Sequence, residues 1–309
     1  MNFFSSGKSK TPEKTSVNEK QPTQEPLLVI PKNCKTITKV NLNEEQQQKI
    51  AQLREDISKI MLSETDDYYE NEKRFLTDAT LHRYLRARKW DLNAARTMLE
   101  NTVNWRREFR PDQLDPDYIR PEVETGKMYY NGYDFYGRPS LIMRPRNENS
   151  KDGDRQIKHI VFCLERGIRL MPEGVETVNI IIDFKGAMAS QHPSIATSKK
   201  FLEILGNHYP ERLGTAFVVK SPWFFLTTFK IISPFIDPVT KSKIKFVYDK
   251  KNENDSKNQG SEMAYLPDYF PEEQIETEFN GKYHFEFNID TYWTQLLELT
   301  GNPYKIFDY

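Results

Sequence analysis

The chain has 309 residues, a formal net charge of −1 at pH 7 and a hydrophobic content of 37%. A chain of this length can bury a sizeable core in one or two domains. Its near-zero net charge gives no electrostatic reason to expect nucleic-acid binding. No run of about 18 apolar residues occurs, and the first ten residues lack the apolar segment of a secretory signal. Because the two cysteines, Cys34 and Cys163, lie far apart, we expect a cytoplasmic protein without a disulfide framework.

Residues 1–40 differ in composition from the rest of the chain. They are rich in Lys, Pro, Ser, Thr and Gln, and their seven lysines outnumber three glutamates, which gives a net charge of +4. Such a segment buries too little apolar surface to order itself, so we predict a disordered basic leader. Phe3 and Phe4 leave open a contact with anionic membrane, although a solvated leader is the simpler interpretation. Residues 26–31, PLLVIP, are apolar enough to dock on the folded body.

Residues 41–122 are expected to form a small helical lobe. A first helix should begin at Asn43, and its apolar residues then share one face: Ile50, Leu53, Ile57 and Ile60. A second helix should begin near Asp78 as its N-cap, and a third covers residues 92–109. Arg88 lies three residues after Leu85, so helical spacing singles it out among several arginines as inward-facing. A buried guanidinium needs an anionic partner, which is either a structural carboxylate or a bound anion.

From residue 123 to residue 309 the pattern changes to alternating strands and helices. Two strands, 127–134 and 138–145, are joined by a tight turn and predict a hairpin. They are followed by further elements in the order helix 155–171, strand 177–184, helix 199–208, strand 215–220 and strand 244–248. This alternation predicts an α/β fold with a mixed or mainly parallel sheet. Asp183, at the end of a buried strand, is better interpreted as a turn cap than as a catalytic group.

An unusually apolar helix is predicted to follow the strand 215–220. Ser221 suits its N-cap and Pro222 its first turn. At roughly 14 residues before Pro234 it is too short to span a bilayer, and a helix without a polar face is either buried or in contact with lipid. Its apolar residues are the candidates for a mobile lid, or gate helix: Trp223, Phe224, Phe225, Phe229 and Ile232. Charged and hydroxyl residues bracket it, a pattern that suits a ligand with a long tail and a charged head: Glu211, Arg212, Asp237, Thr240 and Lys243.

Three motifs in order resemble the CRAL-TRIO family, and within it the secretory-pathway phosphatidylinositol transfer proteins. They are LHRYLRARKW (81–90), HYPERLG (208–214) and PFIDPVTKSK (234–243), and the resemblance extends over residues 76–293. It implies an α/β lobe with an apolar lipid cavity closed by a gate helix, and a small N-terminal helical lobe.

The resemblance also implies roles for four residues. Arg88 and Thr240 match family contacts to the lipid phosphate, while Glu211 and Lys243 match the pair that holds the inositol headgroup. The chemistry is suitable, because a carboxylate accepts hydrogen bonds from hydroxyls and an ammonium donates them to phosphate. A purely structural ion pair between Glu211 and Lys243, latching the gate helix, is the alternative interpretation.

One segment departs from the family members that also carry phosphatidylcholine. Residues 183–191 are DFKGAMASQ, with Met188 in place of a serine-rich contact to the choline-lipid phosphate. A thioether cannot donate a hydrogen bond to phosphate, so the resemblance does not support phosphatidylcholine carriage. Tyr129, Tyr130 and Tyr133 remain candidates for lining a choline cage, and a sterol is another candidate second ligand.

Sequence motifs of common enzymes are absent. The chain contains no G-x-S-x-G, P-loop, H-E-x-x-H or G-x-G-x-x-G motif, and none of its five histidines has zinc-site spacing. His208 is better interpreted as a packed residue at a helix end. We therefore expect no catalytic residue, metal or cofactor, which disfavours a lipid hydrolase.

The predicted function is to extract phosphatidylinositol and carry it between membranes, with transient peripheral contact to intracellular membranes from the cytoplasm. The alternative is a lipid sensor or adaptor that presents phosphatidylinositol to a lipid kinase.

Overall fold

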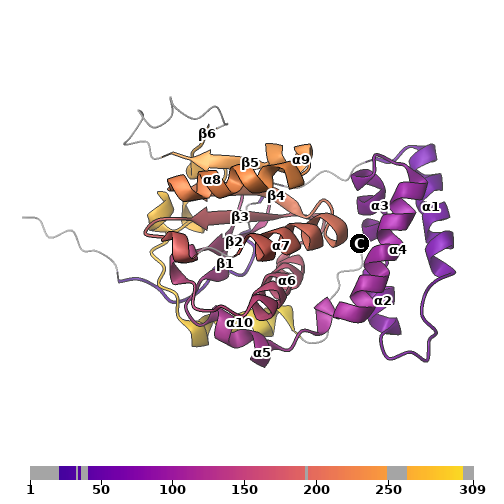
Figure 1. Cartoon of the computed structure of the whole chain (residues 1–309), viewed down its shortest axis with the longest axis horizontal. Helices are drawn as coiled ribbons and strands as arrows, with labels where there is room; N and C mark the ends of the chain where they lie inside the picture. Colours follow the sequence, from indigo (N-terminus) through magenta and orange to yellow (C-terminus); the bar gives the residue numbers. More distant parts are fainter. Residues whose placement is uncertain (1–20, 33, 36–40, 192–193, 249–262, 302–309) are drawn as a thin grey trace, which may run out of the picture.

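The computed structural model describes residues 21–32, 34–35, 41–191, 194–248 and 263–301. Most of the predicted leader and the predicted loop 252–260 lie outside the described residues. The described part forms a helical lobe beside an α/β lobe, as Figure 1 shows. None of the described helices is long and apolar enough to cross a bilayer.

The helical lobe contains α1 (Glu44–Ser58), α2 (Tyr69–Phe75), α3 (Asp78–Ala87) and α4 (Leu92–Phe109). It has a hydrophobic core of its own, whose central residues include those predicted from helical spacing: Leu53, Ile57, Leu81, Leu85 and Leu99. The first helix was predicted to begin at Asn43; it begins one residue later, at Glu44, and Asn43 caps it through a capping box with Gln46. The predicted cap Asp78 is wrong, because the Thr77 side chain accepts the capping bond from the Thr80 amide and Asp78 is the first helical residue.

The α/β lobe is built on a six-stranded mixed sheet with the strand order β1-β2-β3-β4-β5-β6. β1 (Met128–Tyr133) and β2 (Pro139–Met143) form the predicted antiparallel hairpin. The following strands are all parallel: β3 (Val178–Asp183), β4 (Leu213–Val219), β5 (Ile244–Val247) and β6 (Met263–Ala264). The mixed sheet is therefore confirmed, whereas the two-residue β6 has no sequence signal of its own.

Helices cover one face of this sheet. They are α6 (Gly153–Leu170), α7 (Ile195–His208) and α8 (Trp223–Ile232), which lie in front of the strands in Figure 1. The opposite face packs against residues 264–287, where the ring centroids of Phe217 and Phe270 are 5.6 Å apart. Two further helices, α5 (Pro116–Val123) and α10 (Ile289–Thr300), flank α6. The Phe162 and Trp293 rings stack 5.5 Å apart and join α6 to α10.

The predicted docking of residues 26–31 is confirmed. Leu28 is buried in the main core. The Leu27 amide donates to the Asn131 side chain at 2.8 Å, and the Gly132 amide donates to the Leu27 carbonyl at 2.9 Å. Gly132 has φ +81°, and a Cβ at this position would lie 1.9 Å from the Gln274 carbonyl oxygen, so only glycine fits.

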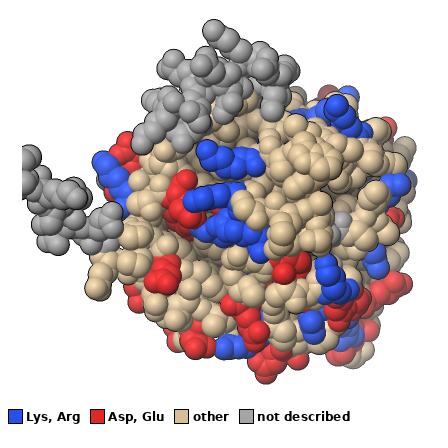
Figure 2. Space-filling view, turned by 60° about the vertical axis from the view of Figure 1, so that its left-hand side comes forward, with Lys and Arg blue, Asp and Glu red and all other residues tan. Residues whose placement is uncertain are grey.

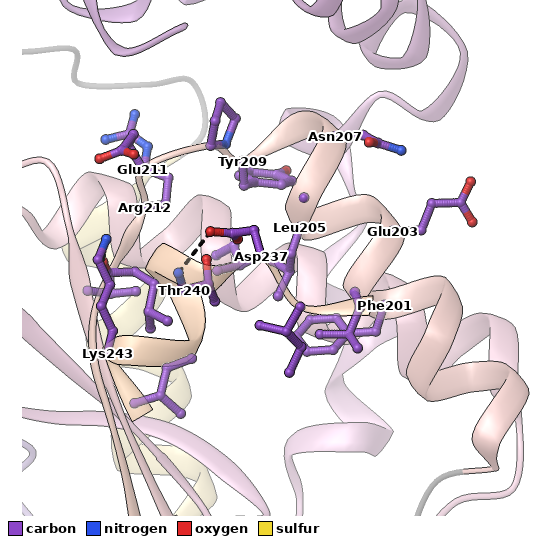
Figure 3. Close-up of a pocket in the computed structure, with 18 of the residues that line it drawn as sticks. Phe201, Glu203, Leu205, Asn207, Tyr209, Glu211, Arg212, Asp237, Thr240 and Lys243 are labelled. Atoms are coloured by element: carbon purple, nitrogen blue, oxygen red, sulfur yellow. Dashed lines mark hydrogen bonds between the residues drawn. The ribbon is translucent and has the colours of Figure 1, made fainter. Parts of the chain in front are cut away.

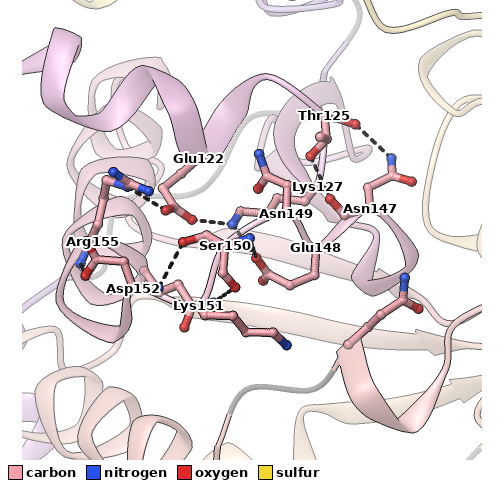
Figure 4. A network of polar contacts seen from close by, with 12 residues as sticks. Glu122, Thr125, Lys127, Asn147, Glu148, Asn149, Ser150, Lys151, Asp152 and Arg155 are labelled. Carbon is pink, nitrogen blue, oxygen red and sulfur yellow. Dashed lines mark hydrogen bonds and ion pairs between the residues drawn. The ribbon is translucent and has the colours of Figure 1, made fainter.

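A buried network of charges fixes the connection between β2 and α6, as Figure 4 shows. Lys127 pairs with Glu122, and its Nζ lies 2.7 Å from a carboxylate oxygen of Glu148. Arg155 contacts the other oxygen of Glu122 at 2.7 Å. Because each buried charge has an opposite partner, the network holds this connection in place without an uncompensated charge.

Both signs of charge are found on the surface. On the face in Figure 2, lysine and arginine side chains gather near the centre beside an acidic group, and acidic side chains are frequent along the lower rim. This mixture agrees with the net charge of −1.

Candidate functional site

A cavity of about 640 Å³ lies between the helix-covered face of the sheet, α7 and the connection from α8 to β5. This volume is within the range of small-molecule sites in proteins. Its wall is largely apolar, with strand residues on one side and helix residues on the other: Leu141, Met143, Val178, Ile180, Ile160, Leu164, Phe201, Leu202 and Leu205. The cavity therefore suits a ligand with an extended apolar part.

The four predicted headgroup residues all line this cavity: Arg88, Glu211, Thr240 and Lys243. They come from three separate places in the fold, namely the end of α3, the entry to β4 and the entry to β5. Figure 3 shows Glu211, Thr240 and Lys243 on one side of the cavity, with Phe201 and Leu205 of α7 opposite. One end of an apolar cavity thus carries the charged and hydroxyl groups.

Lys243 is held by the sheet. It immediately precedes β5, and its carbonyl accepts a hydrogen bond from the Ala216 amide of β4 at 2.9 Å. Its half-buried side chain donates from Nζ to the Leu213 carbonyl at 2.9 Å. Its charge helps to lower the pKa of the nearby Asp237 carboxyl, but among the described residues no carboxylate oxygen lies within ion-pair distance of its Nζ, so a ligand phosphate can contact it directly.

Thr240 belongs to the short helix α9 (Pro238–Ser242), which Asp237 caps. The Thr240 amide donates to the Asp237 carboxylate at 2.9 Å, the bond that is dashed in Figure 3. Burial opposes ionisation of Asp237, but hydrogen bonds from Thr240 and from backbone amides outweigh it and lower the pKa of this carboxyl. The sequence analysis did not assign this capping role to Asp237, although D-P-V-T carries the signal of a helix start.

Glu211 and Lys243 do not form the direct ion pair that the structural alternative requires. Glu211 instead pairs with Arg86, with 3.4 Å between its Oε2 and the arginine Nε. The second partner of Arg86 is Glu176, at 2.8 Å. Sequence reasoning missed Arg86 and Glu176, because no local pattern connects positions so far apart in the chain.

The prediction that Arg88 faces inward is wrong. α3 ends at Ala87, and Arg88 is its exposed C-cap, donating to the Ala87 carbonyl at 3.3 Å. Helical periodicity does not extend past the last helical residue, so the face argument fails at this position. The inward arginine is Arg83, which is 2% exposed and donates to the Pro210 carbonyl at 3.1 Å. Arg88 still reaches the cavity, from its solvent side.

The gate helix differs in two respects from the prediction. Ser221 is not its N-cap, because Pro222 occupies that position and makes no side-chain capping bond. None of the predicted gate residues lines the cavity. Phe225 is instead buried on the sheet, where its ring centroid lies 4.5 Å from that of Phe184. The wall is formed by residues that follow the helix, namely Phe235, Ile236 and Val239.

The residues considered for a choline lipid lie outside the cavity lining. Met188 is on a surface loop and is 60% exposed. Tyr129, Tyr130 and Tyr133 are all buried, the first two in the main hydrophobic core. Tyr129 donates its hydroxyl to Glu276 at 2.9 Å, and Tyr133 donates to the Leu28 carbonyl at 2.7 Å. Tyr130 packs against α6, so no tyrosine cage faces this cavity.

Asp183 and His208 have structural rather than catalytic roles, as predicted. Asp183 accepts a hydrogen bond from the Lys185 amide at 3.0 Å and so caps the turn after β3. The His208 ring stacks on Trp105 at 4.3 Å, and burial together with nearby Arg106 lowers its pKa to about 4. Among the described residues no cluster of His, Cys, Asp and Glu could hold a metal ion.

An apolar cavity with a polar end and an adjacent apolar helix suits a ligand with an apolar tail and a polar head, and comparison with known proteins gives the family. The CRAL/TRIO domain model matches residues 123–281, and the CRAL/TRIO N-terminal domain model matches residues 49–101. The chain belongs to the CRAL/TRIO family.

Three relatives illustrate the similarity. The CRAL-TRIO domain-containing protein C23B6.04c of Schizosaccharomyces pombe is 43% identical over 237 residues, which are 77% of this chain and 22% of the relative. The phosphatidylinositol transfer protein PDR17 of Saccharomyces cerevisiae is 30% identical, over 74% of this chain and 64% of the relative. The SEC14 cytosolic factor of Kluyveromyces lactis is 34% identical, over 70% of this chain and 75% of the relative. The chain therefore spans less than two thirds of the first two relatives.

The crystal structure of Sfh5 shares the fold. It matches with a TM-score of 0.57 and 18% identity, over 84% of this chain and 98% of that chain.

Proposed function

We propose that this protein is a phosphatidylinositol transfer protein, a non-catalytic carrier that takes the lipid out of one membrane and releases it into another. The observation that carries the proposal is the half-buried ammonium of Lys243, which has no ion-pair partner among the described residues and lies at the polar end of an apolar cavity. The names of the relatives PDR17 and SEC14 cytosolic factor support a lipid carrier that works in the cytosol.

The chemistry of the polar end fits an inositol phospholipid. The lipid phosphate would accept hydrogen bonds from Lys243, Arg88 and the Thr240 hydroxyl. The inositol hydroxyls would donate to the Glu211 carboxylate. The acyl chains would lie along the strand residues Val178 and Ile180, where contact with water is least.

Exchange with a bilayer requires the wall of the cavity to open. Residues of α8 and of the connection after it present apolar side chains to solvent: Trp223, Ile231, Phe235 and Val239. Amphipathic surfaces of this kind enter the interfacial layer of a membrane. We propose that α8 and residues 233–239 move outward together on membrane contact, because Phe235 and Val239 belong to both the exposed surface and the cavity wall, whereas Lys243 stays bonded to β4.

Transfer of labelled phosphatidylinositol between donor and acceptor vesicles tests the proposal. The wild-type protein at substoichiometric concentration should move the lipid at a rate that rises linearly with protein. No transfer above the protein-free rate would refute the carrier function. Phosphatidylinositol bound without transfer, together with faster phosphorylation by an added lipid kinase, would favour the presenting adaptor instead.

A further inference from the structure

The end of α3 contacts the segment that enters β4 through three residues. Tyr84 donates its hydroxyl to the His208 carbonyl at 3.0 Å. Arg83 donates to the Pro210 carbonyl, and Arg86 pairs with the Glu211 side chain. The helical lobe therefore fixes both the backbone and a functional side chain at the polar end of the cavity.

Glu211 itself has an unusual backbone conformation. Its φ is +59°, in the left-handed region, which costs an ordinary residue roughly 1 kcal/mol or more. Among the described residues Arg86 is the partner of its carboxylate, and neither side chain is more than about a third exposed. Arg86 divides its donors between two carboxylates, with NH2 toward Glu176 and Nε toward Glu211. One guanidinium thus contacts two carboxylates, of which Glu211 lines the cavity.

The electrostatic effect of Arg86 is visible at Glu176. Burial raises the pKa of this carboxyl, but the charge and hydrogen bond of Arg86, followed by the charges of Arg83 and Arg212, more than offset it, so that the pKa falls below its usual value. Glu176 therefore remains ionised beside Glu211 at neutral pH. Without Arg86, the cavity-lining carboxylate of Glu211 would lose the positive charge that lies beside it.

We propose that Arg86 is a positioning residue that determines which class of headgroup the cavity accepts. It places a positive charge beside Glu211, so that this carboxylate still takes hydrogen bonds from hydroxyl groups but attracts a cationic headgroup less strongly. A polyhydroxylated headgroup on an anionic phosphate is then favoured over a headgroup that carries an ammonium group. This inference rests on the proposed function for its preferred ligand, and it adds a selectivity that the four cavity-lining residues alone do not supply.

The test uses vesicles with equal amounts of phosphatidylinositol, phosphatidylethanolamine and phosphatidylcholine, followed by native mass spectrometry of the reisolated protein. Arg86→Gln removes the charge and retains a polar side chain, so we expect the bound ratio of inositol lipid to ammonium lipids to fall about tenfold. Arg86→Lys should restore most of the ratio. Glu176→Gln leaves Arg86 paired with Glu211 alone and should keep the wild-type ratio.

Two readouts distinguish this role from a structural one. Total lipid occupancy and thermal stability of Arg86→Gln should stay near wild type, since Arg83 and Tyr84 still hold the junction. An unchanged lipid ratio, or an equal loss of every lipid with a lower Tm, would overturn the proposal. The ammonium lipids give an independent measure, because their uptake should rise in Arg86→Gln even if the wild type takes up no phosphatidylinositol. Absence of phosphatidylinositol from the wild type would refute the proposed function, but a rise of the ammonium lipids in Arg86→Gln would still support the role of Arg86.

Discussion

Replacing Lys243 with alanine separates a ligand-binding role from an architectural one. In a buried ion pair with Glu211, removal of the lysine would leave an uncompensated carboxylate and cost about 3–5 kcal/mol. The structure contains no such pair, because Glu211 contacts Arg86 and the Lys243 Nζ contacts the Leu213 carbonyl. The substitution therefore removes one hydrogen bond from a half-buried group, which is worth about 1 kcal/mol. We expect the Tm to fall by about 1–2 °C for a chain of 309 residues.

The effect on lipid binding should be larger than the effect on stability. A desolvated charge-assisted hydrogen bond to phosphate contributes about 2 kcal/mol, which corresponds to roughly a 30-fold loss of affinity. Lys241→Ala is a matched control, because Lys241 is exposed on α9 only two residues away. Phosphatidylinositol transfer should fall strongly in Lys243→Ala and stay near wild type in Lys241→Ala. A large drop in Tm of Lys243→Ala, with loss of every lipid, would refute the reasoning.

Three further predictions follow from the surface, the loop after β3 and the buried histidine. Trp223→Asp with Ile231→Asp should leave the Tm unchanged and slow vesicle transfer, because both side chains are exposed; normal transfer would exclude α8 as the membrane contact. Wild-type protein should transfer phosphatidylcholine weakly, since neither Met188 nor the three tyrosines considered for a choline cage line the cavity; comparable transfer of both lipids would contradict this. Burial and nearby Lys127 lower the pKa of His159 to about 3, so its stabilising contribution is present above pH 6.5 and is lost as the pH falls toward 3. When the pH is lowered from 7.5 to 5.5, the free energy of unfolding measured with a chemical denaturant should fall by about 1.4 kcal/mol less in His159→Gln than in the wild type. Equal losses in the two proteins would refute a neutral buried histidine.

The membrane-contact test uses Trp223 and Ile231 rather than Phe225 and Phe229, which are the more apparent choices from the sequence. Sequence alone suggests that aspartate at both positions would disable a lid without unfolding the protein. In the structure Phe225 is buried against Phe184, and the Phe225 and Phe229 rings stack 5.8 Å apart. Aspartate at these positions would bury a charge in the core, so a loss of transfer there would not identify the lid.

Local periodicity predicted the elements well where the pattern was long. α4 covers the predicted residues 92–109, and the hairpin of β1 and β2 and the buried strand β3 are in their predicted places. The strand β6 escaped prediction because two residues carry no period, and α10, which ends beyond the residues covered by the family resemblance, was not predicted. Helix caps were predicted one residue off in both α3 and α8: Thr77 has a capping side chain as suitable as that of Asp78, whereas Pro222 takes the cap position of α8 without any side-chain capping bond.

The candidate site was partly accessible from sequence. Family motifs led to Glu211, Thr240 and Lys243, and all three line one cavity. The orientation of Arg88 could not be derived, because it depends on where α3 ends. The Arg86–Glu211 pair joins residues from different lobes, and only the packing of α3 against the entry to β4 brings them together. The cavity wall also depends on tertiary packing, which seats Phe225 on the sheet and leaves Phe235 at the cavity.

Identification of the bound lipid tests the central claim most directly. The protein would be purified without detergent from a cytosolic extract, weighed by native mass spectrometry, and its extracted lipids analysed by fragmentation. We predict a single phosphatidylinositol molecule per protein, with a clear reduction in Lys243→Ala purified in parallel. A lipid-free protein that takes up no inositol lipid from vesicles, or a bound lipid without an inositol headgroup, would contradict the account.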